Sequence, residues 1–485
     1  MITISRRLAQ QVRAVLRRAF GQARTGPVVG FIADKEGLTV KSAFGDVAVE
    51  LRVPGARTAD TVWLPFQALE DFEAKKDDPV QLTASDKGQG TAEWRDGKVP
   101  QIVQYDLAKP LDADTFPALP TDFTTNPPGF LQALHEASEV ATPDSARFAL
   151  DCLQLCPDGT INATDGRQAL IQSGFAFPWK EPLLVPRSKV FHSPELPQDK
   201  PVSIAQCGDW LALGVDPWTI CLRINKDGRF PSMERIMPDP AKATARCQLS
   251  EDDRKFLADT LPRLPANDEQ NAPVTLDVNG HVAVRAKSAE QAKPTEVVLT
   301  NSTCSGEPTR IHINRIYLKR AMKLGLRDVC LYGAEVAMLG QSEKCKLVWM
   351  PLDAECAIPP NDDAIRIESP KSEPSSVTSA STSPPPKPKT ERKVQPVSES
   401  NTNTNGKAAS NGSAKAVTAK GKSSRRKTGQ QDVTKLIDQA IKFRTALHDL
   451  MHGSSELVKA LKQHRRQSKA IQSALTSISQ VKTLL

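Results

Sequence analysis

The chain has 485 residues, of which 39% are hydrophobic and 25% charged, and its formal net charge is +8. This length suffices for three domains of ordinary size, each with a core of its own. No stretch approaches the roughly 20 apolar residues of a membrane-spanning helix, and the residues after Met1 lead into a charged segment instead of a secretory leader. We therefore expect a cytoplasmic protein with no membrane partner.

The charge is divided unevenly along the chain. Residues 366–430 contain 13 Lys and Arg against 4 Asp and Glu, and residues 431–485 contain 9 against 4. The tail therefore carries +14 and the first 365 residues carry −6. Because a uniformly basic surface is absent, we expect a polyanion to meet selected faces of the body and the tail.

The same order of predicted elements occurs three times in the first 355 residues: an amphipathic helix, short strands, a second helix after an apolar strand, and further strands. The first helices begin near Ser5, Pro128 and Ser250, about 120 residues apart. The second helices follow apolar segments at residues 62–65, 184–186 and 311–314. Tandem copies of one unit normally form a symmetric scaffold with a shared functional surface. We therefore predict domains at residues 1–124, 125–246 and 247–360.

Two of these helices combine an apolar stripe with a cationic face. In residues 5–18, the apolar positions fall on one side and Arg6, Arg13 and Arg17 on the other. In the third unit, the side chains predicted to point outward are Arg315, Lys319, Arg320 and Lys323. Such faces suit phosphates, although a cationic face on a single helix is more often solvated surface. The first helix of the second unit, residues 130–136, carries an acidic residue instead.

Alternating apolar and polar residues predict strands at 46–53, 210–215, 274–278 and 281–285. Asn279-Gly280 separates the last two and is a strong signal for a two-residue hairpin turn. Each unit is thus predicted to be an antiparallel sheet with two helices, which places the protein in the α+β class.

The composition changes from Ser369 onward to Ser, Thr, Pro, Lys and Asn. Such a segment buries too little apolar area to offset its ordering entropy, so we predict a disordered basic linker over residues 361–430. Apolar positions at helical spacing return in residues 431–485, with a break at Gly453. They predict a helical hairpin that packs on itself, or a coiled coil that binds a partner.

Sequence signals for catalysis or metal binding are missing. The nine cysteines form no Cys-x-x-Cys pair, and Cys152 and Cys156 lack a second pair to complete a zinc site. The chain contains no phosphate-binding Gly-x-x-x-x-Gly-Lys-Ser/Thr loop, no Gly-x-Ser-x-Gly elbow and no His-Glu-x-x-His motif. Asp165 and the pairs at 252–253 and 362–363 are typical of turns and helix starts. We therefore predict a protein that is not an enzyme and needs no metal or cofactor.

Four motifs in a fixed order point to a family. They are the segments Ile161–Leu170, Leu184–Lys189, Asp227–Pro238 and Lys346–Leu352. With the triple repeat, they make residues 1 to about 355 resemble the bacterial DNA sliding clamp, the beta subunit of DNA polymerase III. The resemblance implies three tandem clamp-fold units per chain and a head-to-tail homodimer that forms a ring around double-stranded DNA. It also implies a processivity factor that tethers the replicative DNA polymerase and binds clamp loader subunits, located on the nucleoid.

The resemblance also implies two sets of site residues. Those expected to contact DNA are Arg6, Arg13, Arg17, Arg147, Arg187, Lys189, Arg254, Lys255, Arg315, Lys319, Arg320 and Lys323. Those expected to line a groove for partner peptides are Thr164, Gly166, Arg167, Pro231, Arg235, Ile236, Val348, Met350, Pro351 and Leu352. An apolar slot with a few polar groups suits an extended hydrophobic peptide. The edge strand at 101–105 is expected to form the seam between subunits.

Two departures from the family pattern leave an alternative open. After Thr164-Asp165-Gly166, the family usually has His-Arg-Leu-Ala, whereas this chain has Arg167-Gln168-Ala169-Leu170. The loop at Arg147 and Phe148 aligns with a DNA-reaching loop that usually contains two tyrosines. The alternative is a clamp-fold paralogue that acts as a regulatory or repair-linked binding module without a replicative role. The basic tail is expected to tether the terminal helices near DNA or near the groove.

Overall fold

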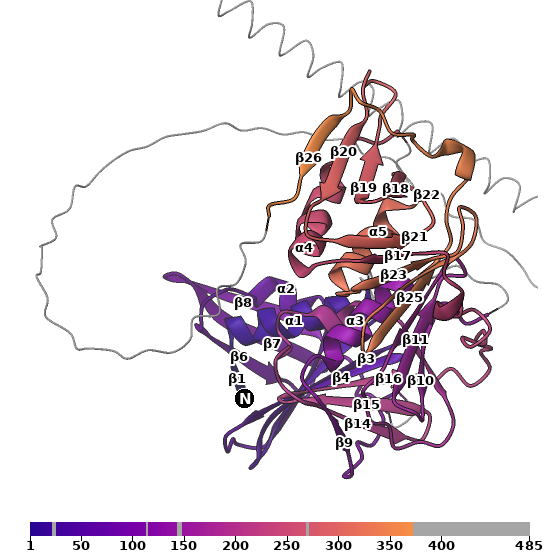
Figure 1. The fold of residues 1–485 in the computed structure, drawn as a ribbon. Coiled ribbons are helices and arrows are strands. Elements are labelled where there is room, and N and C mark those ends of the chain that lie inside the picture. Colours follow the sequence, from indigo (N-terminus) through magenta and orange to yellow (C-terminus); the bar gives the residue numbers. More distant parts are fainter. Residues whose placement is uncertain (22–25, 113–114, 143–147, 268–270, 372–485) are drawn as a thin grey trace, which may run out of the picture. The chain divides into compact units, whose positions relative to one another are not determined.

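The computed structural model describes residues 1–371 except 22–25, 113–114, 143–147 and 268–270 (Figure 1). The chain separates into two compact parts, Met1–Ala380 and Ser381–Leu485. The described residues do not include Ser381–Leu485, which contains the helical segment predicted at 431–485, or most of the predicted linker.

Strands dominate the described part of the chain and form four sheets. The first sheet has the order β1 (Ile2–Ser5), β6 (Pro79–Ala84), β7 (Gln89–Asp96) and β8 (Val99–Asp106). The second has the order β5 (Asp60–Pro65), β2 (Val28–Ala33), β3 (Gly37–Phe44), β4 (Val47–Pro54), β16 (Trp218–Arg223), β15 (Trp210–Val215), β14 (Val202–Cys207) and β9 (Thr124–Asn126). Strands from distant parts of the sequence therefore share one sheet.

The third sheet has the order β13 (Leu183–Pro186), β10 (Cys152–Cys156), β11 (Thr160–Thr164), β12 (Gln168–Gln172), β25 (Cys345–Trp349), β24 (Met338–Gln341), β23 (Asp328–Leu331), β17 (Ala245–Gln248) and β21 (Thr303–Gly306). The fourth has the order β22 (Thr309–Ile313), β18 (Val274–Val278), β19 (Val282–Ala286), β20 (Thr295–Leu299) and β26 (Ile365–Glu368). Neighbouring strands are antiparallel except β20 and β26, which are parallel.

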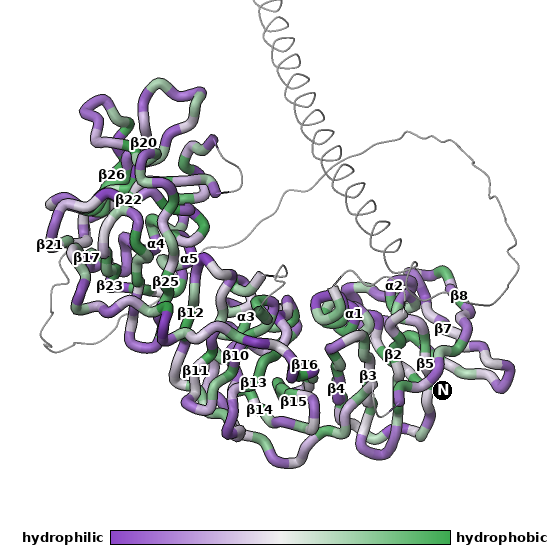
Figure 2. The backbone as a smooth tube through the Cα atoms, turned by 90° about the vertical axis from the view of Figure 1, so that its right-hand side faces the viewer, coloured by the Kyte–Doolittle hydropathy of each residue, from purple (hydrophilic) through white to green (hydrophobic). Residues whose placement is uncertain are grey.

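The helices are α1 (Arg6–Phe20), α2 (Ala68–Phe72), α3 (Phe130–Val140), α4 (Glu251–Thr260) and α5 (Arg315–Lys323). The 3₁₀ turns are η1 (Lys189–His192), η2 (Pro240–Lys242), η3 (Leu261–Arg263) and η4 (Ala354–Cys356). Figures 1 and 2 place α1, α2 and α3 on the same side of the sheet that contains β3, β4 and β16. Within the described ranges, no helix is long and apolar enough to span a membrane.

Local sequence signals explain how the longer helices begin. The Ser5 hydroxyl accepts a hydrogen bond from the Leu8 amide at 3.1 Å, and the Ser250 hydroxyl accepts one from the Asp253 amide at 3.1 Å. Each satisfies a backbone donor that has no partner inside the helix. The predicted apolar stripe of α1 is largely confirmed, because Val12, Val15 and Leu16 are buried; Leu8 is only half-buried.

The predicted strands at 46–53, 210–215, 274–278 and 281–285 are confirmed within one residue as β4, β15, β18 and β19, and the antiparallel sheets with few helices agree with the α+β prediction. Two predictions were wrong. The second helix of the middle unit is only the 3₁₀ turn η1, because Pro194 disfavours a helical conformation for the preceding residue. Residues 365–368 form strand β26 instead of the start of a linker, because a free sheet edge provides backbone partners for them.

A buried ion network lies in the fourth sheet. The Arg285 side chain is 2% exposed, and its Nε lies 2.8 Å from Glu296 Oε1. Its Nη1 pairs with Asp277, and Arg310 Nε lies 3.3 Å from the same carboxylate. These charges are paired within the sheet, as charges removed from water must be.

Candidate functional site

A tight turn between β11 and β12 carries Thr164, Gly166 and Arg167, three of the residues predicted for the partner groove. Asp165 Oδ1 accepts hydrogen bonds from the amides of Arg167 and Gln168, both at 2.8 Å. The Thr164 hydroxyl donates to the Gln168 carbonyl at 2.6 Å. Gly166 has φ +86°, which favours glycine. The turn leaves the Arg167 side chain exposed while Thr164 is buried.

The end of β25 joins this turn through the backbone. The Met350 amide donates to the Arg167 carbonyl at 2.9 Å, and the Leu352 amide donates to the His312 carbonyl at 2.7 Å. Met350 remains 45% exposed. Val348 is buried and belongs to an apolar cluster on which Met237 packs. Val348 is therefore packed inside the protein and does not line a surface groove.

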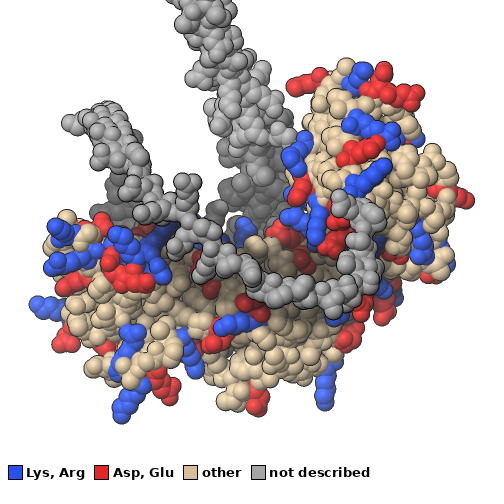
Figure 3. Space-filling model, turned by 60° about the vertical axis from the view of Figure 1, so that its left-hand side comes forward, with Lys and Arg blue, Asp and Glu red and all other residues tan. Residues whose placement is uncertain are grey.

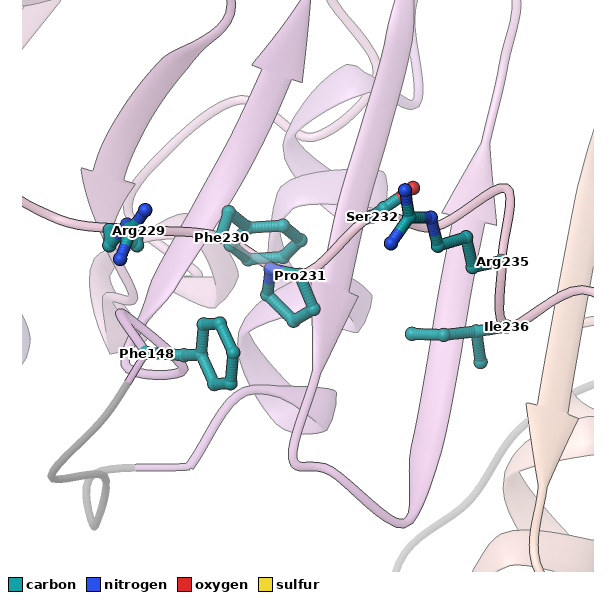
Figure 4. Close-up of a pocket in the computed structure, with 7 residues that line it drawn as sticks. All are labelled: Phe148, Arg229, Phe230, Pro231, Ser232, Arg235 and Ile236. Atoms are coloured by element: carbon teal, nitrogen blue, oxygen red, sulfur yellow. The ribbon is translucent and has the colours of Figure 1, made fainter.

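The loop 229–236 forms the second part of the site and lines a cavity of about 420 Å³. The cavity is lined by Phe148, Arg229, Phe230, Pro231, Ser232, Arg235 and Ile236. Figure 4 shows Phe148, Phe230 and Pro231 close together, with Arg235 and Ile236 further along the same loop. Of the ten predicted groove residues, only Pro231, Arg235 and Ile236 line this cavity.

The sequence prediction did not include Arg229, Phe230 and Ser232 in the groove. The cavity exists because the loop is held against the segment after residue 147: the Ala149 amide donates to the Arg229 carbonyl at 2.9 Å. A Cβ at Gly228 would lie 2.8 Å from the Ala149 Cβ, so the close approach requires glycine. The available sequence signal was the motif Asp227–Pro238, which contains all three of the missed residues.

Helix α5 holds the turn at Asp165 in place. The Tyr317 hydroxyl donates to Asp165 Oδ2 at 3.4 Å, and Arg320 Nη1 donates to Gln168 Oε1 at 2.6 Å. Burial and the neighbouring Asp165 carboxylate raise the pKa of Tyr317. Arg320 also donates to the Glu139 carbonyl at 2.8 Å, so it connects α5 to α3 and to the turn.

Several cations predicted to face DNA are used inside the protein, so the prediction that they face outward was wrong. Arg6 is buried and donates to the carbonyls of Phe72 and Arg95 at 3.0 and 3.2 Å. Arg315 is buried and donates to the carbonyls of Leu264 and Pro265. In both cases a neighbouring chain segment covers the first turn of the helix. Burial lowers the pKa of Arg315.

Of three further cations in the set, one is paired, one is buried and one lies outside the described residues. Arg13 pairs with Glu70 at 2.9 Å and with Glu73 at 2.5 Å. Arg254 is buried, and Arg147 lies outside the described residues. Arg17, Lys189, Lys255 and Lys323 are exposed, and Arg187 and Lys319 are half-buried. Lys255 forms a surface pair with Glu251 at 2.6 Å. Figure 3 shows Lys and Arg interspersed with Asp and Glu over the visible face.

Helices α3 and α5 and the turn η1 line a second cavity, of about 510 Å³. It brings together Lys319 and Lys323 with His135 and His192, whose rings stack at 4.3 Å. Burial is the main cause that lowers the pKa of His135, and the neighbouring His192 lowers it further. The sequence prediction missed both histidines, since they are 57 positions apart and lie outside any motif. No three potential metal ligands converge among the described residues.

These features define a protein of the sliding-clamp fold, and solved structures show the fold directly. The DNA polymerase III subunit beta from Pseudomonas aeruginosa matches with a TM-score of 0.58 and 20% identity, over 73% of this chain and 99% of that chain. The DNA polymerase sliding clamp from Bacillus subtilis matches with a TM-score of 0.58 and 17% identity, over 72% and 98%. A putative DNA polymerase III beta subunit from Eubacterium rectale matches with a TM-score of 0.58 and 11% identity, over 72% and 99%.

No protein-family model and no curated protein matches the sequence. The solved structures confirm, at the level of the fold, the resemblance seen in the four sequence motifs. The matches span nearly the whole of the solved clamps and leave about a quarter of this chain without a counterpart.

Proposed function

We propose that this chain is a DNA sliding clamp, a processivity factor that performs no chemistry itself. Two copies form a head-to-tail ring around double-stranded DNA on the nucleoid and tether a replicative DNA polymerase and clamp loader subunits. The observation that carries this proposal is the continuity of the sheets. Strand β16 extends the sheet of β4, and β25 extends the sheet of β12, both in antiparallel pairing.

We propose three repeated units within 1–124, 125–246 and 247–360, joined at these two sheet junctions. A third junction of the same kind, formed between two chains, closes a ring of six units. Closed symmetric rings are the normal outcome of head-to-tail contacts whose rotation closes. Enclosure then retains the DNA, so affinity for any one sequence is unnecessary.

The cations left for DNA are the exposed or half-buried members of the predicted set: Arg17, Arg187, Lys189, Lys255, Lys319 and Lys323. Phosphate contacts carry no sequence information and permit movement along the duplex. A body of net charge −6 with a few such side chains holds DNA weakly, which suits sliding.

The groove at Arg167, Ile236 and Met350 fits an extended apolar peptide from a partner. Ile236 and Met350 are 38% and 45% exposed and supply apolar surface for such a peptide. Arg167, whose carbonyl accepts from the Met350 amide, and Arg235, next to Ile236 in the chain, are both exposed and suit a carboxylate on the same peptide.

The test is topological. The full chain would be loaded with a clamp loader onto nicked circular DNA, separated from free protein by gel filtration, and then treated with a restriction enzyme that cuts the circle once. A sliding clamp stays on the circle and leaves after linearisation. Equal loss from circular and linear DNA would refute encirclement.

One observation favours the second candidate, a clamp-fold regulatory or repair-linked module that does not encircle DNA. Strand β26 lies on the edge of β20, where the third junction would form. A chain that stays monomeric and binds partner peptides without retention on circles would support this candidate.

A further inference from the structure

The sheet edges of this chain follow one rule at both internal junctions. The strand order β5-β2-β3-β4 continues into β16-β15-β14-β9, and β13-β10-β11-β12 continues into β25-β24-β23-β17. Two further sets have the same internal order, β1-β6-β7-β8 and β22-β18-β19-β20. By the same rule, β8 of one copy pairs with β20 of another copy.

The edge of β8 has no neighbouring strand among the described residues, whereas the edge of β20 is already paired. Strand β8 lies at the edge of its sheet, and its side chains Val99 and Ile102 are 58% and 64% exposed. The edge of β20 is occupied by β26, in parallel register from Thr295 opposite Ile365 to Val298 opposite Glu368. One edge of a strand accepts one partner, because each backbone donor and acceptor pairs once in the ladder.

Specific contacts fix β26 at both ends. The Ile365 amide donates to the Pro294 carbonyl and the Ser369 amide to the Val298 carbonyl, both at 2.9 Å. Ser369 is 3% exposed. Its hydroxyl accepts from the Thr300 amide at 2.8 Å, and its carbonyl accepts from the Thr300 hydroxyl at 2.9 Å.

The pairing is nonetheless weaker than an internal junction between repeated units. Strand β26 has four residues and is parallel, whereas β4 and β16 pair antiparallel over five. Parallel pairing is slightly less stable per residue. The β26 side chains Ile365 and Ile367 remain 53% and 37% exposed, so little apolar burial opposes release. An eight-residue β8 from a second copy is therefore able to displace it.

We propose that β26 is an intramolecular plug of the ring-closing edge: it competes with β8 of a second copy for β20, and release of β26 permits closure. This inference rests on the proposed ring and adds a regulatory step to it. The chain enters the plug from η4 and leaves it toward the basic tail, so a partner that binds the tail is placed to pull β26 away.

The test measures dimerisation of the full chain without DNA, by sedimentation velocity over a concentration series. Ser369→Pro removes the amide bonded to Val298 and the hydroxyl bonded to Thr300. Ile365→Pro removes the amide bonded to Pro294 and serves as an independent release variant. Glu368→Pro is the matched control, because alternation along a strand points its amide away from β20 and proline is tolerated there.

We expect both release variants to lower the dimer Kd at least tenfold, and Glu368→Pro to leave it within twofold of the wild type. Ile102→Lys added to Ser369→Pro restores the weak dimer, because a charge on the exposed edge of β8 opposes pairing. Equal dimer affinity in the wild type and both release variants overturns the plug. Release variants that dimerise tightly yet leave circular DNA as fast as linear DNA support the plug and refute the clamp.

Discussion

Replacing Arg17, Lys319 and Lys323 together by glutamine tests whether the cations of α1 and α5 contact DNA. Arg17 and Lys323 are exposed and Lys319 is half-buried on α1 and α5, and a ring of two chains loses each of them twice. Each lost phosphate contact lowers the slope of log K against log salt by about 0.9, so six lost contacts set a ceiling of about 5. With about half of the six in contact at one time, we expect a decrease of about 3.

The assay is equilibrium binding of the full chain to a short labelled duplex by fluorescence anisotropy, between low and moderate salt. The basic tail is present in both proteins, so its contribution cancels. The control replaces Lys35, Lys242 and Lys287, which are exposed on turns and loops. A salt slope that stays at the wild-type value, or that falls equally in the control, would show that DNA does not contact these cations on α1 and α5.

Three further predictions test the stability, the pH response and the groove. Arg285→Ala leaves the carboxylates of Asp277 and Glu296 inside the sheet without their main partner. We expect the free energy of unfolding, measured with urea, to fall by about 3–5 kcal/mol. Replacing the exposed Lys287 is the control, and a loss below about 1 kcal/mol for Arg285→Ala contradicts the expectation. Because the pKa of His135 is lowered in the folded state, the unfolded chain binds more protons as the pH falls below 6.5, and the free energy of unfolding decreases there. His135→Gln should make this decrease smaller, as measured by the free energies of unfolding at pH 7 and 5.5. The same decrease in the wild type and the variant would exclude the effect. Ile236→Glu places a charge in the groove, and we expect at least tenfold weaker binding of an apolar peptide from a clamp loader subunit by calorimetry, with DNA binding unchanged; loss of both would indicate misfolding instead.

The fold was predictable wherever short-range patterns decide the structure. The alternating segment at 274–285 formed the expected hairpin, but Val278 pairs with Val282, so the connection has three residues instead of the predicted two. Ser5 and Ser250 began helices as their side chains allow. Edge pairing was not predictable in this way. Residues 365–368 alternate Ile with charged residues for only four positions, and such a short segment becomes a strand only because β20 offers an edge about 70 positions earlier in the chain.

Which cations of α5 are exposed was likewise not predictable from short-range patterns. On α5, Arg315, Lys319 and Lys323 are spaced by four residues, so helical periodicity places all three on one face. The structure separates them, since the carbonyls of Leu264 and Pro265 take the Arg315 guanidinium and leave the two lysines outside. A helix can therefore use one cation to dock onto its neighbour and the next two to meet a ligand, and the covering segment, distant in sequence, decides which. Arg320 lies between the two lysines in the chain and lines the same cavity, and it holds the turn beside the groove. Contacts of Lys319 and Lys323 with DNA therefore fall next to the side chain that connects α5 to the turn at Arg167.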